Sequence, residues 1–208
     1  MAFNYIMQAA TCHITKYLAP DPTVVEWGNQ RFRYHPDIVD ICTGIAERPI
    51  RKPVEHVWEF FEDLGYSDYV AIDLNDSLKA IPMDLNYDLG EKYGYKIQHD
   101  LVTNNGTGEH IFDQRLVFEN MHNLCKVGGV MLCVLPFSPW VNHGFYNYHP
   151  ILWRDLVAAN DYEWLFMWIA KNTGEFIDTE IKDWVFYEQK KVKNPMSQLE
   201  EHYYALNE

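Results

Sequence analysis

Four short polar segments carry the residue types that could bind a ligand in this chain. Each follows a predicted strand, and they are Glu26-Trp-Gly-Asn-Gln30, Asp73-Leu-Asn75, Asp84-Leu-Asn86 and Asn104-Asn-Gly-Thr107. The Asp73 carboxylate could accept hydrogen bonds from two ribose hydroxyls, and Asp84 could meet an adenine amino group. Gly28 would let the backbone approach such a ligand, because glycine has no side chain in the way. These residue types favour a nucleoside-like ligand.

The same four segments have a simpler explanation, which is that Asp and Asn are common wherever a strand ends in a turn. For any single segment the two explanations are equally good. In an open, mostly parallel sheet, however, the carboxyl ends of the strands meet at one crevice. Four polar segments at such strand ends would converge there, so the joint pattern is more informative than any one member.

Three histidines are candidates for proton transfer or for orienting a substrate. His110 follows the fourth polar segment, and His143 and His149 lie in the loop after the fifth predicted strand. Histidine titrates near neutral pH and can act as a general base, although hydrogen bonding to loop backbone is the alternative for each. A metal site made by Glu109 and these histidines is conceivable. The spacing matches no H-E-x-x-H pattern, so the sequence predicts no metal.

Alternating strands and helices would position these residues. Strands are predicted at 23–26, 69–73, 83–86, 95–102, 130–137, 163–169 and 183–190. Helices are predicted, from apolar residues at helical spacing, at 2–18, 54–64, 113–126 and 151–160. Residues 31–53 are expected to form a loop or an insertion with short helical pieces. The pattern predicts an α/β fold: a doubly wound, mostly parallel seven-stranded sheet with helices on both faces and an antiparallel hairpin at one edge.

The length and composition indicate a single domain over 1–208, with an N-terminal helix at 1–19, a core at 20–190 and a charged tail at 191–208. The net charge is 17 − 30 = −13, which argues against a nucleic-acid partner. No apolar run approaches the roughly 18 residues of a membrane span, and no signal peptide is recognisable. The four cysteines form no C-x-x-C pair. We therefore expect a cytoplasmic protein that does not associate with a membrane. The sequence is compatible with a homodimer.

The order of the polar segments resembles the Rossmann-like (class I) S-adenosylmethionine-dependent methyltransferases. The matching segments are Val24-Val-Glu-Trp-Gly28, Val70-Ala-Ile-Asp73, Met83-Asp84 and Asp100-Leu-Val-Thr-Asn-Asn-Gly106. The most specific match is Leu124-Cys-Lys-Val-Gly-Gly-Val-Met-Leu132, which is similar to the family's passage from a helix into the fifth strand. The resemblance covers roughly residues 20–190.

This resemblance implies S-adenosylmethionine as the cofactor, a small-molecule acceptor and release of S-adenosylhomocysteine. It implies that Glu26, Gly28 and Gln30 contact the methionine part of the cofactor. Asp73 and Leu74 would contact the ribose, and Asp84 and Leu85 would contact the adenine. It also implies that Asn104, Asn105, Gly106 and Thr107 form the floor beside the sulfonium. His110, His143 and His149 would then serve the acceptor.

The first polar segment departs from the family, whose corresponding loop usually carries two or three glycines. Here Gly28 is followed by Asn29 and Gln30. A single glycine argues against NAD, because a pyrophosphate needs close backbone approach at a helix N-terminus. It also leaves an alternative function open: a non-catalytic nucleoside-binding or regulatory protein on a degenerate methyltransferase scaffold.

Overall fold

A computed structural model describes residues 2–138, 141–172 and 184–188 of the chain. These residues belong to two compact units, Met1–Asn147 and Tyr148–Glu208, which we describe separately. The single-domain boundaries predicted from the sequence stay a prediction, and the predicted tail at 191–208 lies outside the described residues.

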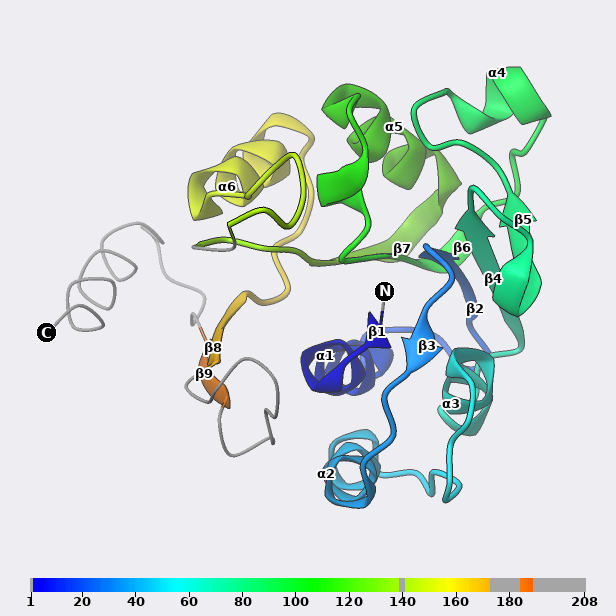
Figure 1. Ribbon diagram of the computed structural model, residues 1–208, viewed down its shortest axis with the longest axis vertical. Helices are drawn as coiled ribbons and strands as arrows, with labels where there is room; N and C mark the ends of the chain where they lie inside the picture. Colours follow the sequence, from blue (N-terminus) through cyan, green and yellow to red (C-terminus); the bar gives the residue numbers. More distant parts are fainter. Residues whose placement is uncertain (1, 139–140, 173–183, 189–208) are drawn as a thin grey trace, which may run out of the picture. The chain divides into compact units, whose positions relative to one another are not determined.

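A parallel sheet forms the centre of the first unit. Its strands are β2 (Thr23–Trp27), β4 (Asp68–Asp73), β5 (Ala80–Pro82), β6 (His99–Asn105) and β7 (Cys125–Val134). They lie in the order β5-β4-β2-β6-β7, and every neighbouring pair is parallel (Figure 1). The predicted α/β fold with a mostly parallel sheet is therefore confirmed. The chain runs outward from β2 to β5 and then returns to β6 on the other side of β2, so the order reverses between β2 and β6.

The strand count predicted from the sequence was wrong. Among the described residues the central sheet has five strands, not seven, and no antiparallel hairpin at its edge. The last two predicted strands, β8 (Trp168–Asn172) and β9 (Trp184–Glu188), pair with each other in a separate antiparallel sheet of the second unit. A third sheet, which the sequence did not suggest, pairs β1 (Ala2–Phe3) with β3 (Arg31–Phe32) in parallel.

Helices cover both faces of the central sheet, as predicted. They are α1 (Tyr5–Thr15), α3 (Val57–Asp63), α4 (Leu89–Tyr93) and α5 (Gln114–Leu124). Helix α2 (Pro36–Ala46) packs on α1, and α6 (Pro150–Ala159) belongs to the second unit. Figure 1 shows α4 and α5 on one side of the central sheet and α1 and α3 on the other. Beneath α5 lies an apolar core that includes Val25, Trp27, Ile72, Val102, Val117, Met121 and Leu124.

Several local predictions differ from the structure. The third predicted strand, at 83–86, is wrong: the strand here is β5, which ends at Pro82, and residues 83–86 follow it. Within 31–53 the chain forms α2, a regular helix of 11 residues with proline at its first position and the His35 ring accepting a hydrogen bond from the Asp37 amide. Strand β6 begins at His99 and extends through Asn105, later and further than the predicted strand at 95–102. The polar residues at its end pair with β7 and are buried, so they belong to the strand and not to a turn.

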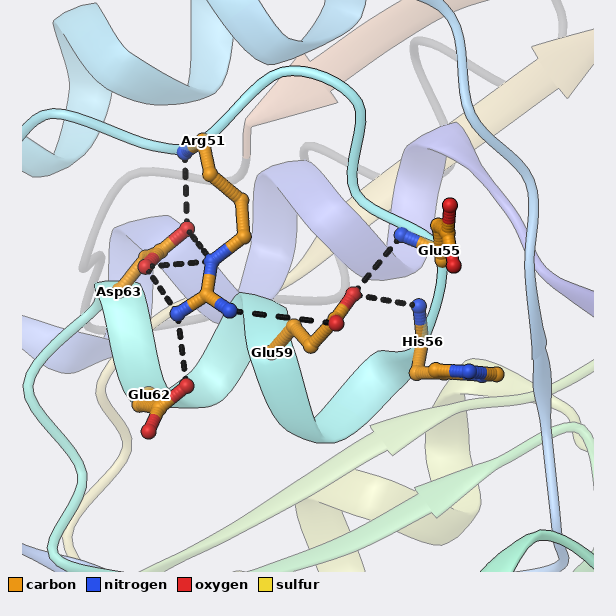
Figure 2. Close-up of polar contacts among 6 residues, drawn as sticks. All are labelled: Arg51, Glu55, His56, Glu59, Glu62 and Asp63. Carbon is orange, nitrogen blue, oxygen red and sulfur yellow. Dashed lines mark hydrogen bonds and ion pairs between the residues drawn. The ribbon is translucent and has the colours of Figure 1, made fainter.

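Helix α3 begins in a network of exposed charges (Figure 2). The Glu59 carboxylate accepts hydrogen bonds from the backbone amides of Glu55 and His56, at 2.9 and 3.0 Å, which caps the helix and lowers the Glu59 pKa. Arg51 lies 3.9 Å from Glu59 and also binds Asp63 at 2.8–2.9 Å. Exposed ion pairs stabilise little, about 0.2–1 kcal/mol each. The Glu59 cap fixes where this helix starts, and Arg51 ties the preceding segment to its last residue, Asp63.

Candidate functional site

The turns after β2 and β6 meet where the strand order reverses. Gly28 has a φ of +84°, and its amide donates to the carbonyl of Ile72 at 2.8 Å. A Cβ at this position would lie 2.5 Å from Oγ1 of Thr107, which itself donates to the carbonyl of Trp27 at 2.7 Å. Both the backbone conformation and this close approach therefore require glycine. Two of the four polar segments come together here, as the sequence predicts.

Glu26 is fully buried at the middle of this edge, with its two carboxylate oxygens engaged. Oε2 accepts from the Tyr69 hydroxyl at 2.6 Å, and Oε1 accepts from the Asn105 side-chain amide at 3.1 Å. Burial raises the Glu26 pKa to about 7, against the opposite effect of the two hydrogen bonds. Burial also raises the pKa of Tyr69 well above its ordinary value. Glu26 therefore changes its protonation state near neutral pH.

Several buried polar atoms beside Glu26 have no hydrogen-bond partner among the described residues. Gln30 donates through Nε2 to the carbonyl of Asn105 at 2.7 Å, but its Oε1 has no partner. Oδ1 of Asn105 and Oγ1 of Thr103 are in the same situation. Buried polar groups are usually satisfied, so such atoms are the ones available to a ligand or to water. They lie on β6 and in the turn that follows β2.

Asp73 joins the turn after β4 to the turn after β2. Its Oδ2 accepts from the Asn29 amide at 2.9 Å, and its Oδ1 accepts from the Leu74 amide at 2.6 Å and from the Asn75 side chain at 3.0 Å. A carboxylate has about four acceptor positions, so these bonds leave about one for a ligand. The Leu74 side chain is 71% exposed at this rim.

The third predicted segment lies at the end of β5. The Met83 amide donates to the Asp73 carbonyl at 2.8 Å, which holds this turn beside the end of β4. Asp84 accepts through Oδ1 from the amide and the side chain of Asn86, both at 2.9 Å. Leu85 is 3% exposed and packs in the apolar core. Its side chain therefore has a packing role that the sequence did not separate from cofactor contact.

A second group of side chains lies in the loop that follows β6. The buried Asn104 accepts through Oδ1 from the Gly108 amide at 2.8 Å, and a Cβ at Gly108 would lie 2.5 Å from Nδ2 of Asn104. Directly after this contact, Oε1 of the buried Glu109 lies 3.1 Å from Nε2 of His143 and 3.8 Å from Nε2 of His110. The structure thus brings together two of the three predicted histidines, with the acidic residue between them.

The remaining predicted residues have local roles in the structure. Gly106 has a φ of +68°, and its amide donates to the carbonyl of Val134 at 2.9 Å. His149 belongs to the second unit, where its Nδ1 accepts from the Ile151 amide at 3.3 Å and caps α6. The predicted functional roles of both residues stay predictions.

Sequence reasoning missed Tyr69 and Thr103. Side chains alternate along a strand, and the register pairs Val24 with Tyr69 and Glu26 with Thr103. Tyr69 and Thr103 therefore share the sheet face of Glu26. The alternation was present in the sequence, but it points to this face only when the neighbouring strands and their register are known.

Comparison of the chain with models of known protein families gives no match, and comparison with curated proteins gives none. In the part of the chain that the structure describes, no helix combines the length and the apolar character that a membrane crossing needs. The function of this protein must therefore be inferred from its fold and from the geometry of the site.

Proposed function

We propose that this protein is a methyltransferase-like enzyme that transfers a methyl group from S-adenosylmethionine to a small-molecule acceptor and releases S-adenosylhomocysteine. The observation that carries the proposal is the joined rim at the point where the strand order reverses. There Gly28 packs against Thr107, and Asp73 binds the Asn29 amide at 2.9 Å. Parallel sheets bind nucleoside-containing ligands at such a point. The net charge of −13 disfavours a nucleic-acid acceptor.

In this proposal the chain contributes binding and alignment. Methyl transfer needs the donor carbon, the sulfur and the acceptor in line, and proximity alone can supply about 7–11 kcal/mol of the barrier. The Gly28 turn approaches the methionine part of the cofactor, and Asp73 accepts from the ribose. His110 and His143, which follow the end of β6 and β7, orient or deprotonate the acceptor.

One observation favours the alternative of a protein that binds a nucleoside without transferring a methyl group. The Asp73 carboxylate already accepts three hydrogen bonds from its own chain, at 2.6–3.0 Å. A ribose with two hydroxyls would have to displace one of these donors. The nucleoside would then bind more weakly than it would to a carboxylate without these donors. Binding of the nucleoside would not by itself imply methyl transfer.

Calorimetric titration and thermal unfolding separate these two functions. A ligand at 100 times its dissociation constant stabilises the folded protein by about 2.7 kcal/mol. We expect stabilisation by S-adenosylmethionine and S-adenosylhomocysteine but not by NAD. Binding together with methyl transfer to hydroxyl or amine acceptors supports the enzyme, whereas binding with no transfer across an acceptor library supports the alternative. Absence of binding by either sulfur nucleoside overturns both.

Replacement of Asp73 by alanine tests the ribose contact. The Asp73→Ala variant should bind S-adenosylhomocysteine about tenfold more weakly, or worse, because a charged hydrogen-bond acceptor is lost. Asp76→Ala removes an exposed carboxylate three residues away, whose side chain makes no capping bond, and it serves as the matched control. Equal affinity in the Asp73 variant and the control would refute the ribose assignment.

A further inference from the structure

The cluster of Glu109, His110 and His143 has the composition and spacing of a metal site. One donor atom from each residue, a carboxylate oxygen or a ring nitrogen, lies within 4.8 Å of the other two. The shorter separations, from Glu109 Oε1 to the two Nε2 atoms, are 3.1 and 3.8 Å. In a tetrahedral site with bonds of about 2.0–2.1 Å, neighbouring donors lie about 3.3 Å apart. The donors therefore need only small side-chain rotations to bind one ion.

The Glu109 carboxylate supplies an independent reason to expect a cation. Glu109 is 1% exposed, and its Oε2 has no hydrogen-bond partner among the described residues. In that part of the chain its ion-pair partners are the two histidines, and no lysine or arginine is among them. A buried carboxylate is costly unless it is paired or coordinates a metal. A plain ion pair with His143 through Oε1 leaves Oε2 unsatisfied, whereas a bound cation can be reached by both oxygens.

The backbone holds the three donors in place without help from the ion. The Glu109 carbonyl accepts from the amides of Phe145 and Tyr146, at 2.7 and 3.3 Å, and the His110 amide donates to the carbonyl of Thr107 at 3.0 Å. A Cβ at Gly144 would lie 2.8 Å from both Cγ and the carbonyl oxygen of Glu109. The loop that carries His143 is therefore packed directly on Glu109. Such preorganisation reduces the cost of assembling a metal site.

We propose that Glu109, His110 and His143 bind a divalent transition-metal ion of the zinc class. Two imidazoles and one carboxylate are the ligand set of catalytic zinc sites, in which a further position stays open to water or substrate. The side chains of His110 and His143 are 39% and 22% exposed, so the ion is reachable from solvent. The sequence alone predicted no metal because the spacing fits no linear motif. The distances among Glu109, His110 and His143 in the folded chain favour a metal site instead.

The open position takes an oxygen of the acceptor, an assignment that rests on the proposed function. The two histidines then orient the acceptor through the ion and do not deprotonate it themselves. A metal ion orients a bound hydroxyl and favours loss of its proton to solvent. The oxygen then attacks the methyl carbon as the bond from that carbon to sulfur breaks and S-adenosylhomocysteine leaves. An acceptor with a hydroxyl or a carboxylate beside the methylated atom fits this chemistry. Metal binding itself requires neither the cofactor nor the acceptor.

The test is a titration of metal-free, full-length protein with Zn²⁺ by calorimetry, repeated with Co²⁺ and followed by visible absorption. We expect one equivalent of Zn²⁺ in the wild type and a tetrahedral Co²⁺ spectrum. His143→Ala and Glu109→Gln should weaken binding roughly 100-fold or more, because the first removes a ligand and the second removes the negative charge of a ligand. His122→Ala, an exposed histidine of α5 outside the cluster, should bind as the wild type does.

The variants also locate the ion. All of them retain the four cysteines, so unchanged binding in His143→Ala and His110→Ala would place the metal on thiols and overturn the proposal. Absence of saturable binding in the wild type overturns it as well. Glu109 is buried, so circular dichroism must show that its variant is folded; if it is not, the exposed His110→Ala decides. The titration contains no S-adenosylmethionine, so its failure leaves the proposed function untouched, and the reverse also holds.

Discussion

The two faces of the central sheet are built from the same strands but differ in how many polar side chains they bury. Beneath α5, residues such as Val25, Ile72 and Val102 form an apolar core. On the opposite face, the next residues along those strands include Glu26 and Thr103, which are equally buried. Burial therefore does not distinguish the faces. The difference teaches that the face beneath α5 is an apolar core, while the other face combines apolar residues such as Val24 and Leu101 with polar groups that are buried at a cost in stability.

This cost can be traced to individual atoms. On the polar face, the Glu26 carboxylate is stabilised by Tyr69 and Asn105 and still has a raised pKa. Oγ1 of Thr103 and Oδ1 of Asn105 have no partner among the described residues. Natural proteins retain such groups most often at functional sites. The comparison can be tested by changing each face in turn.

The largest effect should come from the apolar face. Ile72→Ala removes a fully buried side chain from the core beneath α5, and we expect a loss of about 2–5 kcal/mol in the free energy of unfolding. Urea denaturation followed by circular dichroism measures this loss. A change below about 1 kcal/mol would mean that this face does not carry the stability that we assign to it.

Glu26→Gln should change how stability depends on pH. The Glu26 pKa is raised from 4.5 to about 7, so the folded protein holds a proton that the unfolded chain releases between those values. Stability contributed by this proton is present at low pH and is lost as pH rises from about 5 to about 8, by about 3 kcal/mol at most. Glutamine cannot ionise, and a rotated Asn105 amide could accept from it through Oδ1, which has no partner within the residues that the structure describes.

The measurement for Glu26 is urea unfolding of wild type and variant at pH 5 and pH 8. The difference in stability between the two proteins should shift in favour of the variant at pH 8. The general repulsion of the acidic chain is nearly the same in both proteins and cancels in this comparison. Parallel pH dependence of the two proteins would contradict the buried, titrating carboxylate.

The smallest effect should come from Thr103→Val. The substitution replaces a buried hydroxyl, which has no hydrogen-bond partner in the described part of the chain, by a methyl group of similar size. Because no hydrogen bond is lost, we expect stability to stay the same or to rise by about 1 kcal/mol. A loss of more than about 1 kcal/mol, measured by urea unfolding, would show that this hydroxyl is satisfied in solution.

Local patterns were sufficient to predict most of the sheet and the convergence of its polar ends. Strands such as β2 and β4 are short apolar segments followed by Gly28 and Asp73, and both features follow from neighbours in the sequence. The polar end of β6 was misplaced because the burial of Asn104 and Asn105 depends on pairing with β7. The contact between Glu109 and His143 joins residues 34 apart and follows only from the folded loop.

The loop at Gly144 is held in place by its backbone, while some of its side chains are exposed. It is tied to Glu109 through the amides of Phe145 and Tyr146, so the anchor does not depend on which side chains those positions carry. The rings of Phe112 and Phe145, 74% and 68% exposed, meet edge to face beside the donor cluster. Substitution of these aromatic side chains can therefore change the surface beside the donor cluster while the backbone around Glu109 keeps its shape.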